Sequence, residues 1–267
     1  MIRQPAVAGS FYPADRSQLS AQIDELLDLK NETRPVTGMI VPHAGYIYSG
    51  RIAGEVFAIA DIPRQVILLG PNHHGVGEHV AASGADGWRT PLGTVAVAQR
   101  LREKLTAAIP KIKIDDLAHH HEHSLEVMVP FLQKRQPQVE IVPIALGQLS
   151  LDECLELGRD IAQVISGWDE EVLLLASTDM NHFASAEESQ QLDFMAITAM
   201  TRFDHRALYR VVRDNNISMC GVLPTVVVME AAHDLGAVEC QLVDYAHSGQ
   251  VNGDNGRVVG YAGLILK

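Results

Sequence analysis

Histidines follow the ends of several apolar segments, and they are the first feature of the sequence that could carry chemistry. His43 lies in VPHAGYIYSG after one such segment, and His73 and His74 lie in GPNHHG after VILLG. Further along, STDMNHF places Asp179 and His182 three residues apart after EVLLLA. Imidazoles gathered with a carboxylate serve as metal ligands or as acid–base groups.

Each of these motifs also has an ordinary structural interpretation. His43 on its own would be a turn histidine bonded to backbone, and Asp179 could cap the helix that follows it as well as orient His182. GPNHHG is the stronger motif, because an exposed turn would normally use Asp, Asn or Ser. We therefore expect His73 or His74 to be functional, although the residues do not decide between them.

The stretch LAHHHEHSLEVMVPF has the highest density of imidazoles. Residues 118–123 lack the apolar periodicity of a helix, so we expect His119, His120 and His121 to lie in a solvated loop. His123 and Glu126 adjoin an apolar helical segment, and we expect both to be held inward. Ser124 is the expected start of that helix.

Cys220 comes directly before a glycine, near the start of an apolar segment with helical period. The positive end of a helix dipole would favour its thiolate as a nucleophile or a metal ligand, whereas the ordinary alternative is a small buried side chain. We assign the other two cysteines, Cys154 and Cys240, to packing. Three cysteines without paired spacing favour a reducing cytoplasm.

Apolar segments alternate with helix-period segments, which predicts an α/β fold. Expected strands end near His43, Pro71, Leu146 and Ser177, and each leads toward a helix, the last of them over Glu187–Met200. Two final strands, AVECQLVDYA and RVVGYAGLIL, would close the sheet antiparallel. We expect one domain over residues 1–267, with a central mixed, mostly parallel sheet flanked by helices.

Loops beyond the carboxyl ends of parallel strands meet at one edge of a sheet, where ligands bind. The histidines of the separate motifs should therefore meet there. The sequence contains no P-loop, no dinucleotide fingerprint and no GxSxG, and HHHEH is not the zincin motif. Histidines with one carboxylate or thiolate thus indicate a metal site before a nucleophile.

The overall composition excludes some partners. The 33 acidic residues against 21 basic ones give a formal charge of -12, which disfavours nucleic acid and anionic lipid. No apolar stretch approaches the roughly 18 residues of a membrane span, and the N-terminal residues do not resemble a signal peptide. We expect a cytoplasmic protein without nucleic-acid or membrane partners.

Six motifs taken together resemble one family. AGSFYP, PHAGYIYSG, GPNHHG, EHSLEVMVPFLQ, STDMNHF and CGVLP occur in the order and spacing of the Memo family, also called AmmeMemoRadiSam system protein B, from about Ala8 to Gly263. The resemblance implies the fold of class III extradiol dioxygenases, which are non-haem iron enzymes that bind Fe(II) with two histidines and a glutamate.

The resemblance also implies roles for particular residues. It implies His43, His73 and Cys220 as metal ligands, with His182 as acid–base group and Asp179 lining the same pocket. We add His123 and Tyr46 as catalytic candidates. The resemblance makes Fe(II) the first expectation, and Cu or Zn are alternatives because a cysteine, a softer ligand, replaces the glutamate of the dioxygenases.

Three functions remain open at this stage. The first is a redox metalloenzyme acting on an unknown small molecule. The second is a module that binds a peptide or partner protein in the cleft, because an adaptor role has been proposed for some family members. The third is a zinc hydrolase, for which Glu126 is the only candidate base. The resemblance further implies a pathway link to a radical-SAM protein.

Overall fold

Four strands that are buried almost throughout form the centre of the protein. The computed structural model describes residues 1–27 and 33–267. In it, β8 (Glu140–Leu146), β3 (Gln65–Pro71), β9 (Val172–Ser177) and β2 (Gly38–Val41) lie side by side and all run parallel. Strands covered by helices on both faces are apolar on both faces, which is why these segments have continuous rather than alternating hydrophobicity.

Shorter and antiparallel strands extend this centre on both sides. Within the described residues the sheet has 12 strands, in the order β1-β5-β6-β8-β3-β9-β2-β12-β10, with β11 on β12 and with β4 between β7 and β8. The C-terminal pair joins β2 antiparallel, as expected from its sequence. The remaining strands are β1 (Ile2–Arg3), β4 (Val80–Ala82), β5 (Gly87–Thr90), β6 (Gly93–Val97), β7 (Lys113–Ile114), β10 (His182–Ala184), β11 (Cys240–His247) and β12 (Val258–Leu266).

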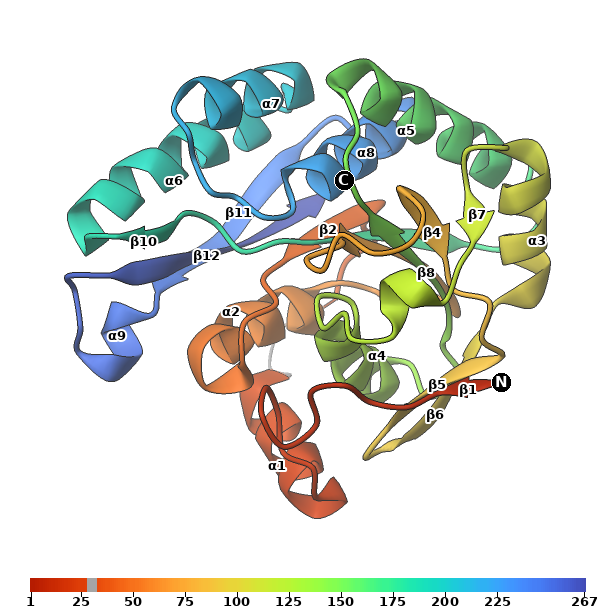
Figure 1. The fold of residues 1–267 in the computed structure, drawn as a ribbon, viewed down its shortest axis with the longest axis horizontal. Helices are drawn as coiled ribbons and strands as arrows, with labels where there is room; N and C mark the ends of the chain where they lie inside the picture. The colour runs from red at the N-terminus through yellow and green to blue at the C-terminus, as the bar shows by residue number, and fades with distance from the viewer. Residues whose placement is uncertain (28–32) are drawn as a thin grey trace.

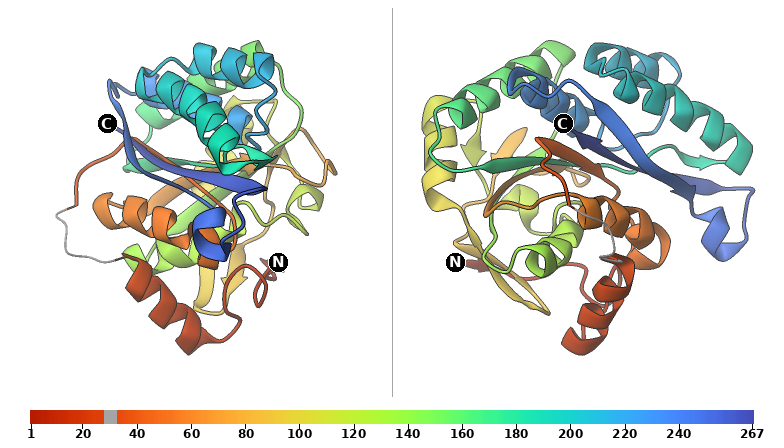
Figure 2. Two further views of the ribbon diagram at one scale, coloured as in Figure 1. Left: turned by 90° about the vertical axis from the view of Figure 1, so that its left-hand side faces the viewer. Right: turned by 180° about the vertical axis from the view of Figure 1, so that it is seen from behind.

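Helices cover the two faces of the sheet. α5, α6, α7 and α8 lie on one face and α1, α2 and α4 on the other (Figure 1; Figure 2, left), and each layer has its own apolar core against the sheet. The helices are α1 (Arg16–Leu27), α2 (Tyr46–Ile59), α3 (Gln99–Ala108), α4 (Val129–Arg135), α5 (Leu151–Ser166), α6 (Ala186–Thr201), α7 (His205–Asp214), α8 (Val222–Asp234) and α9 (Gly249–Asn252), with 3₁₀ turns at Leu117–His119 and Glu126–Met128.

The predicted fold class is confirmed, and the differences lie at element boundaries. The strand expected to reach His43 ends at Val41, which leaves His43 on the loop before α2. Ser124 does not cap a helix: its hydroxyl donates to the carbonyl of Pro71, and the segment enters α4 through a 3₁₀ turn. The Gly-rich loop between the last two strands contains the short helix α9. In the described part of the chain, no helix is long and apolar enough to cross a bilayer.

Glu126 holds the N-terminal segment against the rest of the fold. Its buried carboxylate accepts hydrogen bonds from the Arg3 guanidinium (2.6 Å), the Tyr12 hydroxyl (2.5 Å) and the amides of Ala6 (2.7 Å) and Val7 (3.1 Å). Glu126 does lie inward, as expected. Because its oxygens are all engaged, it is a structural residue, and its suggested role as a hydrolytic base is wrong.

Replacing Glu126 should destabilise the fold strongly. Glu126→Gln leaves the buried Arg3 without its counter-charge, so we expect the free energy of unfolding to fall by about 3–5 kcal/mol. Urea denaturation followed by circular dichroism measures this loss. Glu103→Gln, on the exposed face of α3, is the matched control and should leave the midpoint unchanged. Equal midpoints for the two variants would contradict the structural role of Glu126.

Candidate metal centre

Three imidazoles from separate loops converge at the carboxyl ends of the central strands. His43 follows β2, His73 follows β3, and His123 precedes the 3₁₀ turn at Glu126–Met128. One nitrogen of each lies within 4.8 Å of the others, a group that could hold a metal ion. The rings of His73 and His123 are stacked with centroids 4.7 Å apart, and His43 meets both edge-on at 5.2 and 5.4 Å.

The tautomer of His43 follows from its hydrogen bonds. The Ser177 hydroxyl donates to the carbonyl of Ser124 at 2.6 Å, so it must accept from Nδ1–H of His43 at 2.8 Å. Nε2 of His43 is therefore the unprotonated nitrogen. An outer partner that fixes one ring nitrogen leaves the other available as a metal ligand.

Glu122 does the same for His73 and also connects two loops. One carboxylate oxygen accepts from Nδ1–H of His73 (2.8 Å) and from the amides of His123 (3.0 Å) and Ser124 (2.9 Å), and the other accepts from the His73 amide (2.7 Å). Burial alone would raise the pKa of Glu122, but the hydrogen bond and charge of His73 outweigh it and hold the pKa well below its usual range.

Sequence reasoning missed Glu122. Its only signal was a carboxylate directly before His123, and the contact that matters, with His73, spans 49 residues. The side chain is only 1% exposed, so its charge has to be satisfied by these N–H donors.

Burial keeps two of the imidazoles neutral. It lowers the pKa of His123 to about 4, and it lowers the pKa of His43 well below the usual value, with the charges of His73 and His123 acting in the same direction. The ring of Phe11 covers His123 at a centroid distance of 4.7 Å. Neutral imidazole is the form that binds a metal, so this group is ready to bind one at neutral pH.

Cys220 lies beside this group, just before α8. Its Sγ is 3.3 Å from Nε2 of His43 and accepts from the Asp179 amide at 3.3 Å. Burial raises the pKa of the thiol, and the nearby charge of Asp179 raises it further. The expectation that the helix dipole would favour a thiolate is therefore wrong for the metal-free chain, because desolvation dominates. The other two cysteines are buried in the apolar core, as expected.

Asp179 lies beneath His43. Its carboxylate accepts from the His43 amide at 2.7 Å, and burial raises its pKa to about 7 against the lowering effect of the His43 and Ala44 amides. The alternative role as a helix cap is excluded, because Ser185 caps α6 by accepting from the amide of Glu188.

His182 begins β10 on the same side of the sheet. Its Nδ1–H donates to the carbonyl of Ser218 at 2.9 Å and its backbone amide donates to the Ser218 hydroxyl at 2.8 Å, so Nε2 is the unprotonated nitrogen of the neutral ring. Burial lowers the pKa of His182. Ser218 in turn donates to the side-chain oxygen of Asn181, and the backbone amide of Asn181 donates to the buried carboxylate of Asp193 at 2.7 Å.

Tyr46 does not reach the imidazoles with its hydroxyl. That hydroxyl donates to the carbonyl of Val127 at 2.7 Å, and the ring packs between Tyr12 and Phe131 in the apolar core. Tyr46, the first residue of α2, is thus part of the apolar packing, and its suggested catalytic role stays a prediction.

The other histidines of the two rich motifs point elsewhere. His119 is buried, not solvated as expected, because its Nε2 meets the carbonyl of Ala81 at 2.9 Å and its ring packs on Trp88. His120 and His121 are exposed, as expected, and the exposed His74 contacts the carbonyl of His121. Of the GPNHHG pair, it is His73 that joins the group.

A cavity of about 420 Å³ opens beside the group. It is large enough for a small ligand. Its polar wall includes the side chains of His73, Asn72, Gln148 and Cys220.

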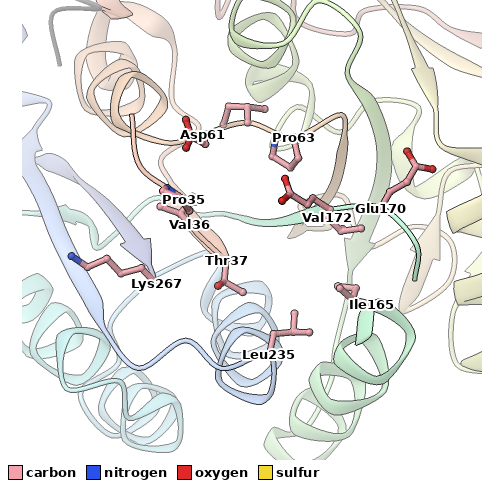
Figure 3. Close-up of a pocket in the computed structure, with 12 residues that line it drawn as sticks. Pro35, Val36, Thr37, Asp61, Pro63, Ile165, Glu170, Val172, Leu235 and Lys267 are labelled. Carbon is pink, nitrogen blue, oxygen red and sulfur yellow. The ribbon is translucent and has the colours of Figure 1, made fainter. Parts of the chain in front are cut away.

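A larger cavity, of about 670 Å³, lies at the opposite end of the strands (Figure 3). Thr37, which precedes β2, and Val172, the first residue of β9, line it together with Asp61, Glu170 and Lys267. Its lining contains neither histidine nor cysteine, whereas the three imidazoles that could hold a metal ion lie at the carboxyl ends of the strands.

Comparison with known proteins identifies the family. The model of the family described as Memo-like protein matches residues 3–265. The chain belongs to the Memo-like family. A MEMO1 family protein of Aquifex aeolicus is 42% identical over 99% of both chains, and one of Methanosarcina barkeri is 38% identical over the full length of both.

A solved structure supports the fold of this Memo-like chain. The crystal structure of an uncharacterised protein from Escherichia coli K12 matches with a TM-score of 0.55 and 14% identity, covering 86% of this chain and 99% of that one. At this identity the likeness concerns the fold alone.

The role of Glu122 can be tested on metal affinity. Glu122→Gln replaces the acceptor of His73 Nδ1–H by a neutral amide, so we expect the affinity for Fe(II) or Zn(II) to fall by about 10- to 100-fold. Competition with a chromogenic chelator measures it. Glu78→Gln, an exposed change on the β3–β4 loop that also carries His73, should leave the metal affinity unchanged. A folded Glu122→Gln variant with wild-type affinity would contradict the assignment.

Asp193 should give the Memo-like fold a measurable pH dependence. Burial raises its pKa to about 6, opposed by hydrogen bonds from the Asn181 amide and the Tyr245 hydroxyl. The folded pKa lies above the unfolded value of about 3.9. The stability that Asp193 contributes to the fold is therefore fully present below the unfolded pKa and is lost as the pH rises through 6.

Asp193→Asn should remove this loss. We expect the stability of the variant relative to wild type to increase from pH 4 to pH 7, as measured by urea midpoints across this range. Asp214→Asn, an exposed change at the end of α7, is the control. Parallel pH profiles for wild type and Asp193→Asn would contradict the assignment.

Proposed function

We propose that this Memo-like chain is a non-haem metal-dependent oxidoreductase similar to the extradiol dioxygenases, with Fe(II) as the first candidate metal and Cu or Zn as alternatives. The observation that carries the proposal is the convergence of His43, His73 and His123 within 4.8 Å. Burial keeps His43 and His123 neutral, and the hydrogen bonds at Nδ1 leave Nε2 of His43 and of His73 as the nitrogens that would bind a metal.

His43 and His73 are proposed as two of the metal ligands, and two residues are candidates for the third ligand. His123 completes the imidazole group, whereas Cys220 is the ligand that the family resemblance implies. A metal displaces the proton of a coordinating thiol, so the raised pKa of Cys220 in the metal-free chain does not prevent it from binding. Imidazole suits iron, copper and zinc, and sulfur adds preference for the softer ions.

His182 is proposed as the acid–base group. Its Nδ1–H is held by the carbonyl of Ser218, which leaves Nε2 as the nitrogen that would take a proton from a phenolic hydroxyl of the ligand. Asp179, with a pKa of about 7, can hold or release a second proton beside His43. A bound metal would supply Lewis-acid and redox chemistry, while the chain positions the ligand and moves protons.

The hydrolase alternative is weaker because Glu126 is engaged with the N-terminal segment. The cavity of about 420 Å³ suits a small molecule, and its polar wall of Asn72 and Gln148 would orient it. The cysteines are all free, and a reducing cytoplasm would keep Cys220 able to bind metal.

Metal analysis separates the candidate ligands. After anaerobic reconstitution with Fe(II) we expect about one ion per chain, and O₂ consumption with a panel of catechols that stops on chelation. Cys220→Ala and His123→Ala should each be compared with Cys154→Ala, a buried cysteine in α5 remote from the histidines. The variant that loses the ion identifies the third ligand. Absence of metal from reconstituted wild type would contradict the proposal, and ligand binding that survives chelation would favour the binding-module alternative.

His182 should matter for turnover and not for the metal. His182→Ala is expected to lower kcat by about 10²- to 10⁴-fold, because a proton-transfer group is lost, with metal content unchanged. Steady-state O₂ uptake across pH measures it. The exposed His233→Ala is the control. Unchanged kcat in a metal-loaded His182→Ala variant would exclude the acid–base role.

A further inference from the structure

Phe183 has an unusual backbone at the edge of the histidine site. It lies in β10 between His182 and Ala184 with φ of 68°, and 64% of it is exposed to solvent. A large non-glycine residue rarely adopts a positive φ, and such conformations cluster at ligand-binding and catalytic sites. An exposed phenyl ring gains little from burial in the fold, so stability of the core does not account for the arrangement.

The conformation brings Phe183 to the same side as His182. Neighbouring residues of a regular strand point to opposite faces. Here the pairing of β10 with β12 shifts register between His182 and Ala184, and the two rings meet edge-on with centroids 5.6 Å apart. Bulges of this kind redirect a side chain beside an active site.

Arg257 lies over the redirected ring. Its guanidinium carbon is 4.5 Å from the centroid of Phe183, at the end of the loop that precedes β12. That loop is held in place, because the amide of Ala186 donates to the carbonyl of Asn255 at 2.9 Å and the amide of Gly256 donates to Asp254 at 2.9 Å. The cation therefore has a defined position.

Arg257 differs from the other arginines that stack on aromatic rings. Arg3 over Trp88 is paired with Glu126, and Arg100 over Trp168 is paired with two carboxylates. In the part of the chain that the structure describes, Arg257 has no carboxylate partner, although the formal charge of the protein is -12. A guanidinium above an aromatic ring makes no hydrogen bond to that ring, so its N–H groups remain able to bind an oxyanion in bidentate fashion.

We propose that Phe183 and Arg257 form an oxyanion-recognition element at the edge of the histidine site, which binds a carboxylate or phosphoryl group of the ligand. Phe183 is the platform that orients the guanidinium, and His182 lies next to it. Ser218, which holds His182, is two residues from Cys220, so the element adjoins the metal-binding groups. The inference rests on the proposed function only in assigning the rest of the ligand to the cavity.

Simple probes test the element without turnover. Purified protein of measured metal content is titrated with benzoate, inorganic phosphate and the neutral analogue benzamide at constant ionic strength, with binding followed by calorimetry and by NMR. The variants are Arg257→Gln, Arg257→Lys and Phe183→Leu. Arg210→Gln, an exposed arginine on α7, is the matched control for loss of one positive charge.

We expect wild type to bind at least one of the two oxyanions and to discriminate against benzamide. Arg257→Gln should weaken binding by about 10- to 100-fold because a charge-assisted pair is lost, and Arg257→Lys should recover only part of it. Phe183→Leu should weaken binding less, and Arg210→Gln should not change it. Preference for benzoate would identify a carboxylate ligand, and preference for phosphate would identify a phosphoryl ligand.

Three results would overturn the proposal: no oxyanion binding by wild type, equal binding by folded Arg257→Gln, or an equal loss in Arg210→Gln. These outcomes are separate from failure of the proposed function, because metal content and O₂ uptake are measured independently of anion affinity. A chain that binds oxyanions through Arg257 but turns over no substrate would keep the recognition element and remove the oxidoreductase.

Discussion

The buried carboxylate of Glu122 is the interaction on which the candidate metal centre depends. A charge that is only 1% exposed must be satisfied by hydrogen bonds, and its partners are N–H groups of His73, His123 and Ser124. The loop after β3 and the loop before the 3₁₀ turn are therefore held together by one side chain. Two of the three converging imidazoles owe their mutual position to it.

The same constraint recurs at two other places in the fold. Glu126 gathers the N-terminal segment through the Arg3 guanidinium and the Tyr12 hydroxyl, and Asp193 supports the loop that carries His182 through the Asn181 amide. Each carboxylate is buried and accepts bonds from segments distant in sequence. The apolar sheet and helices supply the framework, and these few polar contacts fix the loops at its carboxyl edge.

Burial also determines the charge of the site. It holds His43 and His123 neutral and keeps the Cys220 thiol protonated, so these three groups carry no positive charge of their own. A cation can approach such a site without repulsion in an acidic protein. Arg257, stacked on Phe183 at the edge, is the complementary feature that an anionic ligand would recognise.

The sequence by itself determined the alternation of strands and helices and the placing of His43 and His73 just beyond strand ends, because period and spacing record which face of each element is buried. Its six motifs, taken together, indicated the family by resemblance. It did not determine that Glu122 binds His73, that His119 is buried, that the Tyr46 hydroxyl faces Val127, or that Phe183 takes a positive φ. Those features depend on which polar groups meet across tens of residues. Local pattern carries no record of such pairs, so only the tertiary structure decided them.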